Sequence, residues 1–219
     1  MITLYHCYNA RSFRPLWALE EMGLSYELKM LPFPPRALAK EYFEVNPLGT
    51  IPAFLDGDTF MTESSAICEY LAAKYGPTPL TVTPNEPEFG AYLNALYFGE
   101  ATLTFPQTLV LRYSRLEPPE RRNPQVADDY ARWFYGRLKA VMRRVESHDF
   151  VCAARFTMAD ISVGYALLLA RDLGIDGEFT PALRAYWTRI TSRDGYARAV
   201  ASQKKHAEAQ GLRSAIPSA

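Results

Sequence analysis

A proline at the entrance to an apolar run is the first feature of this chain that could do chemistry. In the segment Asn46-Pro-Leu-Gly-Thr-Ile-Pro-Ala-Phe54, Pro52 directly precedes the apolar residues 53–55. Proline cannot donate to a β-ladder, so it fits a strand at its first residue, at an edge or in a turn. An X-Pro bond is also the one place where a cis peptide bond costs little. A cis bond here would turn the main chain of Ile51 outward, where it could pair with an extended peptide.

A glutamate and a serine stand at the start of the next helical pattern. Glu63 and Ser64 precede an apolar-periodic stretch over residues 65–75. A helix N-terminus is a ready place to hold a charged ligand group. Taken alone, the pair would also fit an ordinary acidic helix start with a capping serine. Together, the two motifs indicate a site for a charged, peptide-like ligand.

Composition and charge argue against a nucleic-acid-binding, membrane-spanning or metal-binding protein. The 219 residues carry a formal net charge of +0 and have a pI near 6.8, which gives no footprint for nucleic acid or an anionic membrane. The longest apolar run, residues 166–170, is too short to span a bilayer. The cysteines and histidines show no ligand spacing: Cys7, Cys68, Cys152, His6, His148 and His206. We therefore expect no metal, no disulfide framework and, without an apolar leader after Met1, a cytoplasmic location.

The elements that must position these motifs alternate between strand and helix over residues 1–76. Strand patterns are expected at residues 2–6, 26–30, 53–55 and 59–61, and helix patterns at 15–22, 37–43 and 65–75. Asp56-Gly57-Asp58 is a hairpin signal between the last two strands. A βαβ unit followed by ββα predicts an α/β, thioredoxin-like domain.

The rest of the chain has a different pattern. Residues 77–87 contain four prolines and little periodicity, as in an interdomain linker. Residues 88–219 show helical spacing without strand-like alternation, which predicts an all-helical domain. Within it, Thr157 and Asp160 form a capping-box pattern at the start of a helix that is apolar nearly all round. That helix is expected to be central and structural.

Three motifs resemble those of the glutathione S-transferase family, in order and at similar spacing. They are Asn46-Pro-Leu-Gly-Thr-Ile-Pro52, Glu63-Ser64 and Phe156-Thr-Met-Ala-Asp-Ile161. The resemblance extends over about residues 2–198, and the segments 14–24 and 97–103 look like a bacterial branch. It implies a cytoplasmic, homodimeric detoxification enzyme, a glutathione transferase. Such an enzyme binds glutathione as co-substrate, stabilises its thiolate and adds it to small apolar electrophiles.

The resemblance also implies which residues hold glutathione. Ile51 would pair by its backbone with the cysteinyl unit, and Pro52 would set the geometry. Glu63 would receive the γ-glutamyl ammonium group, and Ser64 the carboxylate. Thr50 stands where the family often has a lysine or glutamine for the glycyl carboxylate. Because Thr50 has no charge, Arg36 or Lys40 could supply it.

Activation of the thiol is implied for the loop Cys7-Tyr-Asn-Ala-Arg-Ser-Phe-Arg14. A free thiol has a pKa of about 8.5, and a helix N-terminus together with a hydroxyl hydrogen bond lowers it. Ala10 stands where related sequences have the activating serine. We predict Ser12, which could instead be the helix N-cap, as the activating residue, and Asn9 as the second choice. Tyr8 is a third candidate, and Cys7 could form a mixed disulfide with glutathione.

The electrophile site is expected between the domains, on the helix that begins near residue 88. Its candidate walls are aromatic side chains that would equally fit a helical core: Tyr97, Phe98, Phe105 and Tyr113. Two alternatives to the transferase stay open. A glutathione-dependent disulfide reductase or peroxidase is disfavoured by the missing dithiol, and a non-catalytic glutathione-binding protein is favoured by Ala10.

Overall fold

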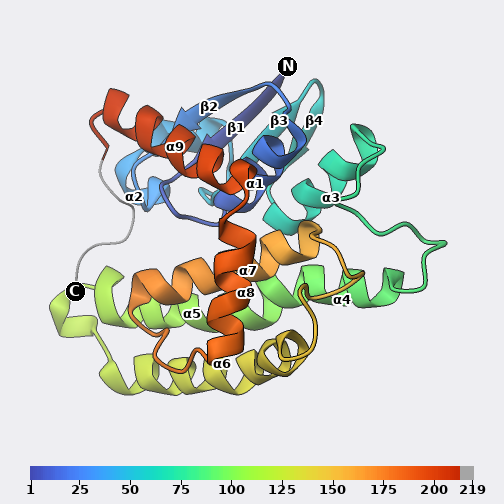
Figure 1. Ribbon diagram of the computed structural model, residues 1–219. Coiled ribbons are helices and arrows are strands. Elements are labelled where there is room, and N and C mark those ends of the chain that lie inside the picture. Colours follow the sequence, from blue (N-terminus) through green and yellow to red (C-terminus); the bar gives the residue numbers. More distant parts are fainter. Residues whose placement is uncertain (213–219) are drawn as a thin grey trace. The chain divides into compact units, whose positions relative to one another are not determined.

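Residues 1–212 are described by the computed structural model, and they form two compact units (Figure 1). The first unit contains residues 1–78 and 192–212, and the second contains residues 79–191. This division differs from the expected domains 1–76 and 88–219, because the last helix groups with the first unit. No helix in the described part of the chain is long and apolar enough to cross a membrane.

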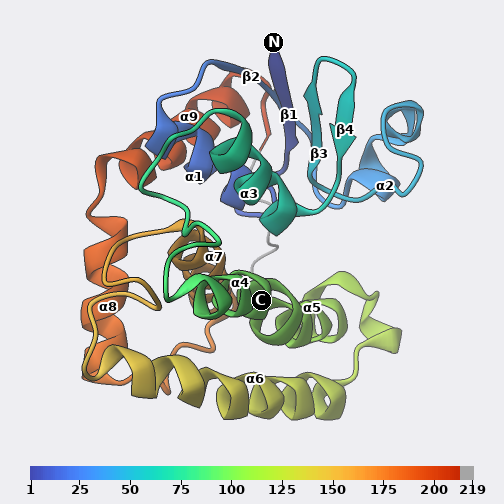
Figure 2. The same cartoon turned by 90° about the vertical axis from the view of Figure 1, so that its right-hand side faces the viewer.

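A four-stranded mixed sheet is the centre of the first unit (Figure 2). Its strands are β1 (Ile2–His6), β2 (Tyr26–Met30), β3 (Ala53–Asp56) and β4 (Thr59–Met61), in the order β2-β1-β3-β4. β1 runs parallel to β2 and antiparallel to β3, and β3 runs antiparallel to β4. Burial alternates along β1, so His6 shares a buried face with Ile2 and Leu4. The thioredoxin-like arrangement predicted from the sequence is confirmed.

Four helices accompany this sheet. They are α1 (Phe13–Met22), α2 (Pro35–Leu38), α3 (Ser64–Lys74) and α9 (Asp194–Ala209). α1 packs against α3, and α9 lies along α1 and β2, as Figure 1 shows. α1 ends at Gly23, whose φ of 63° is the left-handed conformation that glycine adopts without cost. α9 therefore brings a segment from the end of the described chain onto the first strands and helices.

The helix predicted at residues 37–43 is wrong in its bounds. The segment begins earlier, with Pro35 as the first residue of α2, because a proline fixes the φ that a helix start needs. Ala39, with φ of −141° and ψ of 74°, then interrupts the helix. A 3₁₀-helix follows at Lys40–Glu44.

The second unit is helical throughout. It contains α4 (Phe89–Tyr97), α5 (Phe105–Leu111), α6 (Pro124–Val145), α7 (Met158–Leu173) and α8 (Pro181–Thr191). Two π-helical segments, Phe98–Thr104 and Arg112–Leu116, continue α4 and α5. Gly99 lies so close to α7 that a Cβ atom there would be 2.4 Å from Ser162 Oγ. Glycine at this position therefore permits the close approach of the two helices.

α7 is buried along most of its length and begins with the predicted capping box. The main-chain N–H of Thr157 donates to Asp160 Oδ2 over 2.9 Å. Asp160 Oδ1 also accepts from Val151 N at 3.1 Å and from the Tyr186 hydroxyl of α8 at 2.9 Å. This carboxylate therefore connects the start of α7 to the preceding loop and to α8.

Part of the predicted linker, residues 79–82, packs on the helical unit. Leu80 and Val82 are buried, and the main-chain N–H of Met158 donates to Leu80 O over 2.7 Å. The guanidinium group of Arg155 donates to the carbonyl oxygens of residues 79 and 81. The proline-rich composition therefore reflects a segment of turns that is attached to the helical unit through residues 79–82.

Candidate functional site

Side-chain hydrogen bonds hold the loop before β3 in one shape. Asn46 Nδ2 and the Tyr42 hydroxyl each donate to Thr50 O over 2.8 Å. Gly49 has a φ of 60°, and a Cβ atom there would be 2.8 Å from the Phe43 ring. Glycine is therefore required both by the backbone conformation and by the space available. Thr50 itself is exposed, with its carbonyl oxygen turned to this network.

Ile51 lies at the end of this loop, just before β3, and its main-chain N–H and C=O make no hydrogen bond with the described residues. The Ile51–Pro52 bond is cis, as predicted. Among the described residues, none forms a hydrogen bond with the main-chain N–H or C=O of Ile51. Its side chain packs on the cluster of Cys7 and Ala10 in the loop between β1 and α1. An extended ligand could therefore pair with Ile51 next to that loop.

The start of α3 presents a carboxylate and a hydroxyl side by side. Glu63 is the exposed N-cap residue, and no partner for its carboxylate occurs within residues 1–212. Ser64 is the first helical residue and is 3 % exposed. Its Oγ accepts a hydrogen bond of 3.1 Å from Nη1 of Arg14, a fully buried cation. An ammonium group could bind Glu63, and an anion could bind at the helix N-terminus above the Arg14 guanidinium.

The two basic residues considered for the glycyl carboxylate lie in the segment before Gly49. Arg36, in α2, and Lys40, in the 3₁₀-helix, are both exposed. A Cβ atom on Gly49 would be 2.9 Å from Arg36 Cβ, so Arg36 packs against the loop that carries Thr50. Of the two, Arg36 is the one that the contacts place next to this loop.

A buried polar network lies beneath the β1–α1 loop. His6 Nδ1 is 2.7 Å from Ser12 Oγ, and His6 Nε2 is 3.0 Å from Gln203 Oε1. The main-chain N–H of Cys7 donates to Ser12 Oγ over 3.3 Å. Gln203 Oε1 also accepts from Asn9 N at 3.1 Å, and Gln203 Nε2 donates to Asn9 Oδ1 at 2.7 Å. The network therefore joins α9 to the loop that was predicted to activate a thiol.

The position of Ser12 does not fit the role predicted for it. Because Gln203 Oε1 can only accept, His6 Nε2 must carry a proton. Burial lowers the pKa of His6 to about 4, so the ring is neutral and Nδ1 is an acceptor. The Ser12 hydroxyl therefore donates its one proton to His6 and has none for a bound thiol. Its side chain is fully buried and does not cap α1 either.

The other residues considered in this loop fall into two groups: Cys7 and Ala10 are buried, whereas Tyr8 and Asn9 are half-buried. Cys7 is fully buried, with Sγ 3.6 Å from Pro32 O, and burial raises the pKa of its thiol well above the usual range. This position does not fit a mixed disulfide with glutathione. Ala10 is buried and has no polar atom to offer. Asn9 and Tyr8 are half-buried, and Asn9 has a φ of 51°, a conformation that asparagine tolerates well.

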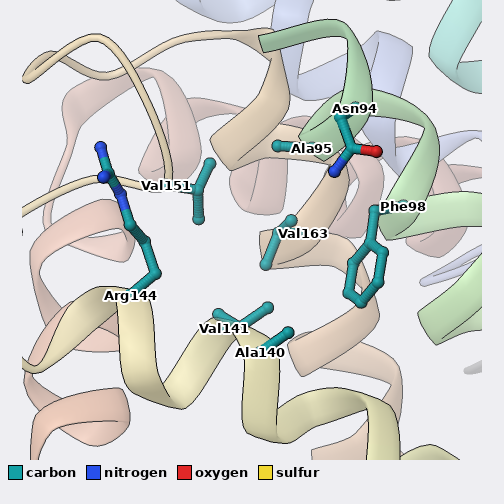
Figure 3. Close-up of a pocket in the computed structure, with 8 residues that line it drawn as sticks. All are labelled: Asn94, Ala95, Phe98, Ala140, Val141, Arg144, Val151 and Val163. Atoms are coloured by element: carbon teal, nitrogen blue, oxygen red, sulfur yellow. The ribbon is translucent and has the colours of Figure 1, made fainter. Parts of the chain in front are cut away.

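The four aromatic candidates for an electrophile site differ in exposure, and one of them lines a cavity. Tyr97 and Phe105 are 53 % and 52 % exposed, whereas Phe98 and Tyr113 are half-buried. Only Phe98 lines the cavity of about 120 Å³ in the helical unit (Figure 3). The other lining residues are Asn94, Ala95, Ala140, Val141, Arg144, Val151 and Val163. Figure 3 shows Arg144 and Phe98 on opposite sides of the cavity, and the residues between them are mainly aliphatic.

Three residues of the site were missed by sequence reasoning: His6, Arg14 and Gln203. In the sequence, His6 shows no ligand spacing, and Arg14 is only the last residue of the loop before the helix. The alternation of β1 could have shown that His6 faces inward. Gln203 is 197 residues from His6, and no local pattern connects them.

Comparison with known proteins agrees with this geometry. The family model "Glutathione S-transferase, N-terminal domain" matches residues 1–73. Glutathione S-transferase 3 of Schizosaccharomyces pombe is 36% identical over 103 residues, and Glutathione S-transferase D7 of Drosophila melanogaster is 33% identical over 131. These alignments cover 47% and 58% of this chain. They span 43% and 54% of the relatives, about half of their length.

A solved structure matches over nearly the whole chain. The glutathione transferase URE2P6 of Phanerochaete chrysosporium, in complex with oxidized glutathione, has a TM-score of 0.81 and 27% sequence identity. The match covers 94% of this chain and 97% of that protein. A thioredoxin-like unit and a helical unit of this kind define the glutathione S-transferase fold. Residues 1–73 thus match a glutathione S-transferase N-terminal domain, and the chain has the glutathione S-transferase fold over nearly its whole length.

Proposed function

We propose that this protein is a glutathione transferase that binds glutathione, lowers the pKa of its thiol and adds the thiolate to a small apolar electrophile. The unpaired peptide groups of Ile51 carry the proposal most directly. They lie beside the β1–α1 loop, and a peptide-like ligand would satisfy them. Glutathione, as an extended tripeptide with charged ends, fits such an edge.

The two ends of glutathione have separate partners in this assignment. Glu63 receives the γ-glutamyl ammonium group, and Ser64 receives the adjacent carboxylate, with the Arg14 guanidinium behind it. Pro52 fixes the direction of the Ile51 peptide. Thr50 lies next to the glycyl end, where Arg36, or Lys40 in its place, supplies the positive charge.

The thiol is activated by Asn9 in this proposal, in place of Ser12. Each pKa unit of thiol depression requires about 1.4 kcal/mol of preferential thiolate stabilisation. An amide N–H of Asn9 and the positive end of α1 are two sources of that stabilisation. Tyr8 is the remaining alternative on this loop.

The helical unit contributes the electrophile site in this proposal, with Tyr97, Phe98, Phe105 and Tyr113 as its candidate walls. Exposed aromatic surface of this kind also favours a partner. We propose that the protein acts as a homodimer in the cytoplasm and serves detoxification.

One rival has a specific observation in its favour. Ala10 has no hydroxyl, and the hydroxyl proton of Ser12 is engaged by His6. A protein that binds glutathione without activating it would tolerate both features. A reductase or peroxidase that uses Cys7 is disfavoured by the burial and the raised pKa of that thiol.

Glutathione binding is tested by Glu63→Gln, measured by isothermal titration calorimetry. The variant keeps the size of the side chain and loses the charge that pairs with the ammonium group. We expect an affinity about tenfold lower, as for the loss of a charge-assisted hydrogen bond of about 1.5 kcal/mol. Asp58→Asn, in the exposed β3–β4 turn, is the matched control and should bind normally. Equal affinities for both variants and the wild type would refute this site.

A further inference from the structure

Gln203 is a buried polar residue from α9 that reaches the β1–α1 loop. It is 1 % exposed and hydrogen-bonds both His6 and Asn9. Three groups of these two residues, His6 Nε2, Asn9 N–H and Asn9 Oδ1, hydrogen-bond to it. A buried carboxamide with all these partners is held in one orientation.

That orientation is determined by the partners. The main-chain N–H of Asn9 can only donate, so Gln203 Oε1 must face it, and the proton on His6 Nε2 follows from that orientation. Gln203 Nε2 then points to Asn9 Oδ1, at 2.7 Å. A reversed carboxamide would place two donors against two donors and would leave Asn9 Oδ1 opposite an acceptor.

The orientation of the Asn9 side chain follows from this pairing. Its Oδ1 is held toward Gln203 Nε2, so Nδ2, the other branch of the planar carboxamide, cannot occupy that position. The backbone of Asn9 is fixed at the same time, because its N–H binds the same Gln203 side chain at a positive φ of 51°. The Asn9 oxygen is thereby committed to Gln203, and the NH₂ group is the end of the carboxamide that Gln203 does not bind.

We propose that Gln203 is a positioning residue for thiol activation: it holds the Asn9 carboxamide so that its N–H side, not its oxygen, is offered to the sulfur of glutathione. This inference rests on the proposed function, in which Asn9 is the thiol-activating residue. Gln203 does not touch the ligand in this scheme and acts only through Asn9.

A purely structural role is the alternative. α9 has other attachments, however: the Arg193 guanidinium binds the Glu21 carboxylate through two hydrogen bonds of 2.9 and 2.8 Å. The Tyr26 hydroxyl is also 2.9 Å from Ser202 Oγ. Because these contacts do not involve the β1–α1 loop, loss of Gln203 should leave α9 in place. The two roles can therefore be separated experimentally.

The test is Gln203→Met, which keeps the length of the side chain and removes its polar atoms. The readouts are the pKa of enzyme-bound glutathione, by ultraviolet absorbance of the thiolate, and kcat and KM for glutathione. We expect the thiol pKa to rise by about one unit and kcat to fall about tenfold at neutral pH, with KM for glutathione nearly unchanged.

Arg193→Met is the matched control, since it removes the Arg193–Glu21 ion pair between the start of α9 and α1 without touching Asn9. It should lower thermal stability and leave the thiol pKa unchanged.

Two further variants keep the inference testable if Gln203→Met fails to fold. Gln203→Glu accepts from His6 and Asn9 N but cannot donate to Asn9 Oδ1, so it should reverse the Asn9 carboxamide and raise the thiol pKa. In an Asn9→Ala background, either Gln203 substitution should have little additional effect on that pKa. If the pKa of bound glutathione in the Gln203 variants equals that in the wild type, the inference is wrong, while the proposed function still stands. The same conclusion follows if Arg193→Met shifts that pKa equally. A wild-type protein that does not lower the thiol pKa would overturn the proposed function and the inference with it.

Discussion

At the scale of single residues, the direction of a few protons decides what the β1–α1 loop can do. The Ser12 hydroxyl donates a hydrogen bond to His6 Nδ1, and His6 Nε2–H donates one to Gln203 Oε1. A serine that is fully buried and engaged in this way stabilises the fold. Of the candidates considered in this loop, Asn9 is the one that combines partial exposure with a side-chain amide N–H donor.

Asn9→Asp tests this difference. An aspartate keeps the shape of the side chain and still accepts from Gln203, but it replaces the N–H donors by a negative charge that repels a thiolate. We expect the pKa of bound glutathione to rise by at least about one unit and kcat to fall more than about tenfold. The comparison variant is Ser12→Ala. It should lower the free energy of unfolding by about 2 kcal/mol, because it removes two buried hydrogen bonds, yet retain the thiol pKa. A larger pKa shift in Ser12→Ala than in Asn9→Asp would contradict the assignment.

The parts of the candidate site that could be predicted are those encoded by neighbouring residues. Pro52 after Ile51, and Ser64 after Glu63, each carry their signal within one turn or one helix start. Gln203 lies 194 residues from Asn9, and their pairing depends on the packing of α9 onto α1 and β2. The same limit applies to Ser12, because its place in the loop is visible in the sequence and its pairing with His6 is not.

At the scale of elements, the strands were predicted more accurately than the short helices. Alternation along β1 and β2 reflects burial on one face, which the sequence records directly. The segment after Pro35 contains two short helical pieces that periodicity cannot separate. The start of α7 was predictable because Thr157 and Asp160 encode a capping box by themselves.

Asp160→Asn tests the contribution of that box. The carboxylate of Asp160 accepts hydrogen bonds on both oxygens, from Thr157, Val151 and Tyr186. An asparagine must place its NH₂ group against at least one of these donors, so we expect a loss of about 3 kcal/mol in the free energy of unfolding. Chemical denaturation measures it, with Asp128→Asn on the exposed surface of α6 as the control. A loss as small as that of the control would contradict the structural role.

At the scale of the whole molecule, two buried groups respond to pH in opposite directions. Burial lowers the pKa of His6 from 6.5 to about 4, so the unfolded chain takes up that proton first and stability falls as the pH decreases through this range. Burial raises the pKa of Asp160 from 3.8 to about 6, so its contribution falls as the pH increases. Each amounts to about 3 kcal/mol over its full range, and the two oppose each other between pH 4 and 6.

His6→Gln separates the two effects. The variant can still donate to Gln203 and accept from Ser12, but it has no titratable ring. We expect the stability of the wild type relative to this variant to decrease by about 2–3 kcal/mol as the pH falls from neutral to about 4.5. Denaturant unfolding at both pH values measures it, and the exposed His148→Gln is the control. A difference between wild type and His6→Gln that does not depend on pH would show that His6 titrates normally.

The central claim is that this site binds glutathione and lowers the pKa of its thiol. The most direct measurement is a pH titration of the ultraviolet absorbance of the glutathione thiolate, with the purified protein in excess. Free glutathione gives the reference midpoint, near the ordinary thiol pKa of about 8.5. We predict a midpoint at least about one unit lower in the complex. A saturable complex with an unshifted midpoint, or no complex, would contradict the proposed transferase activity.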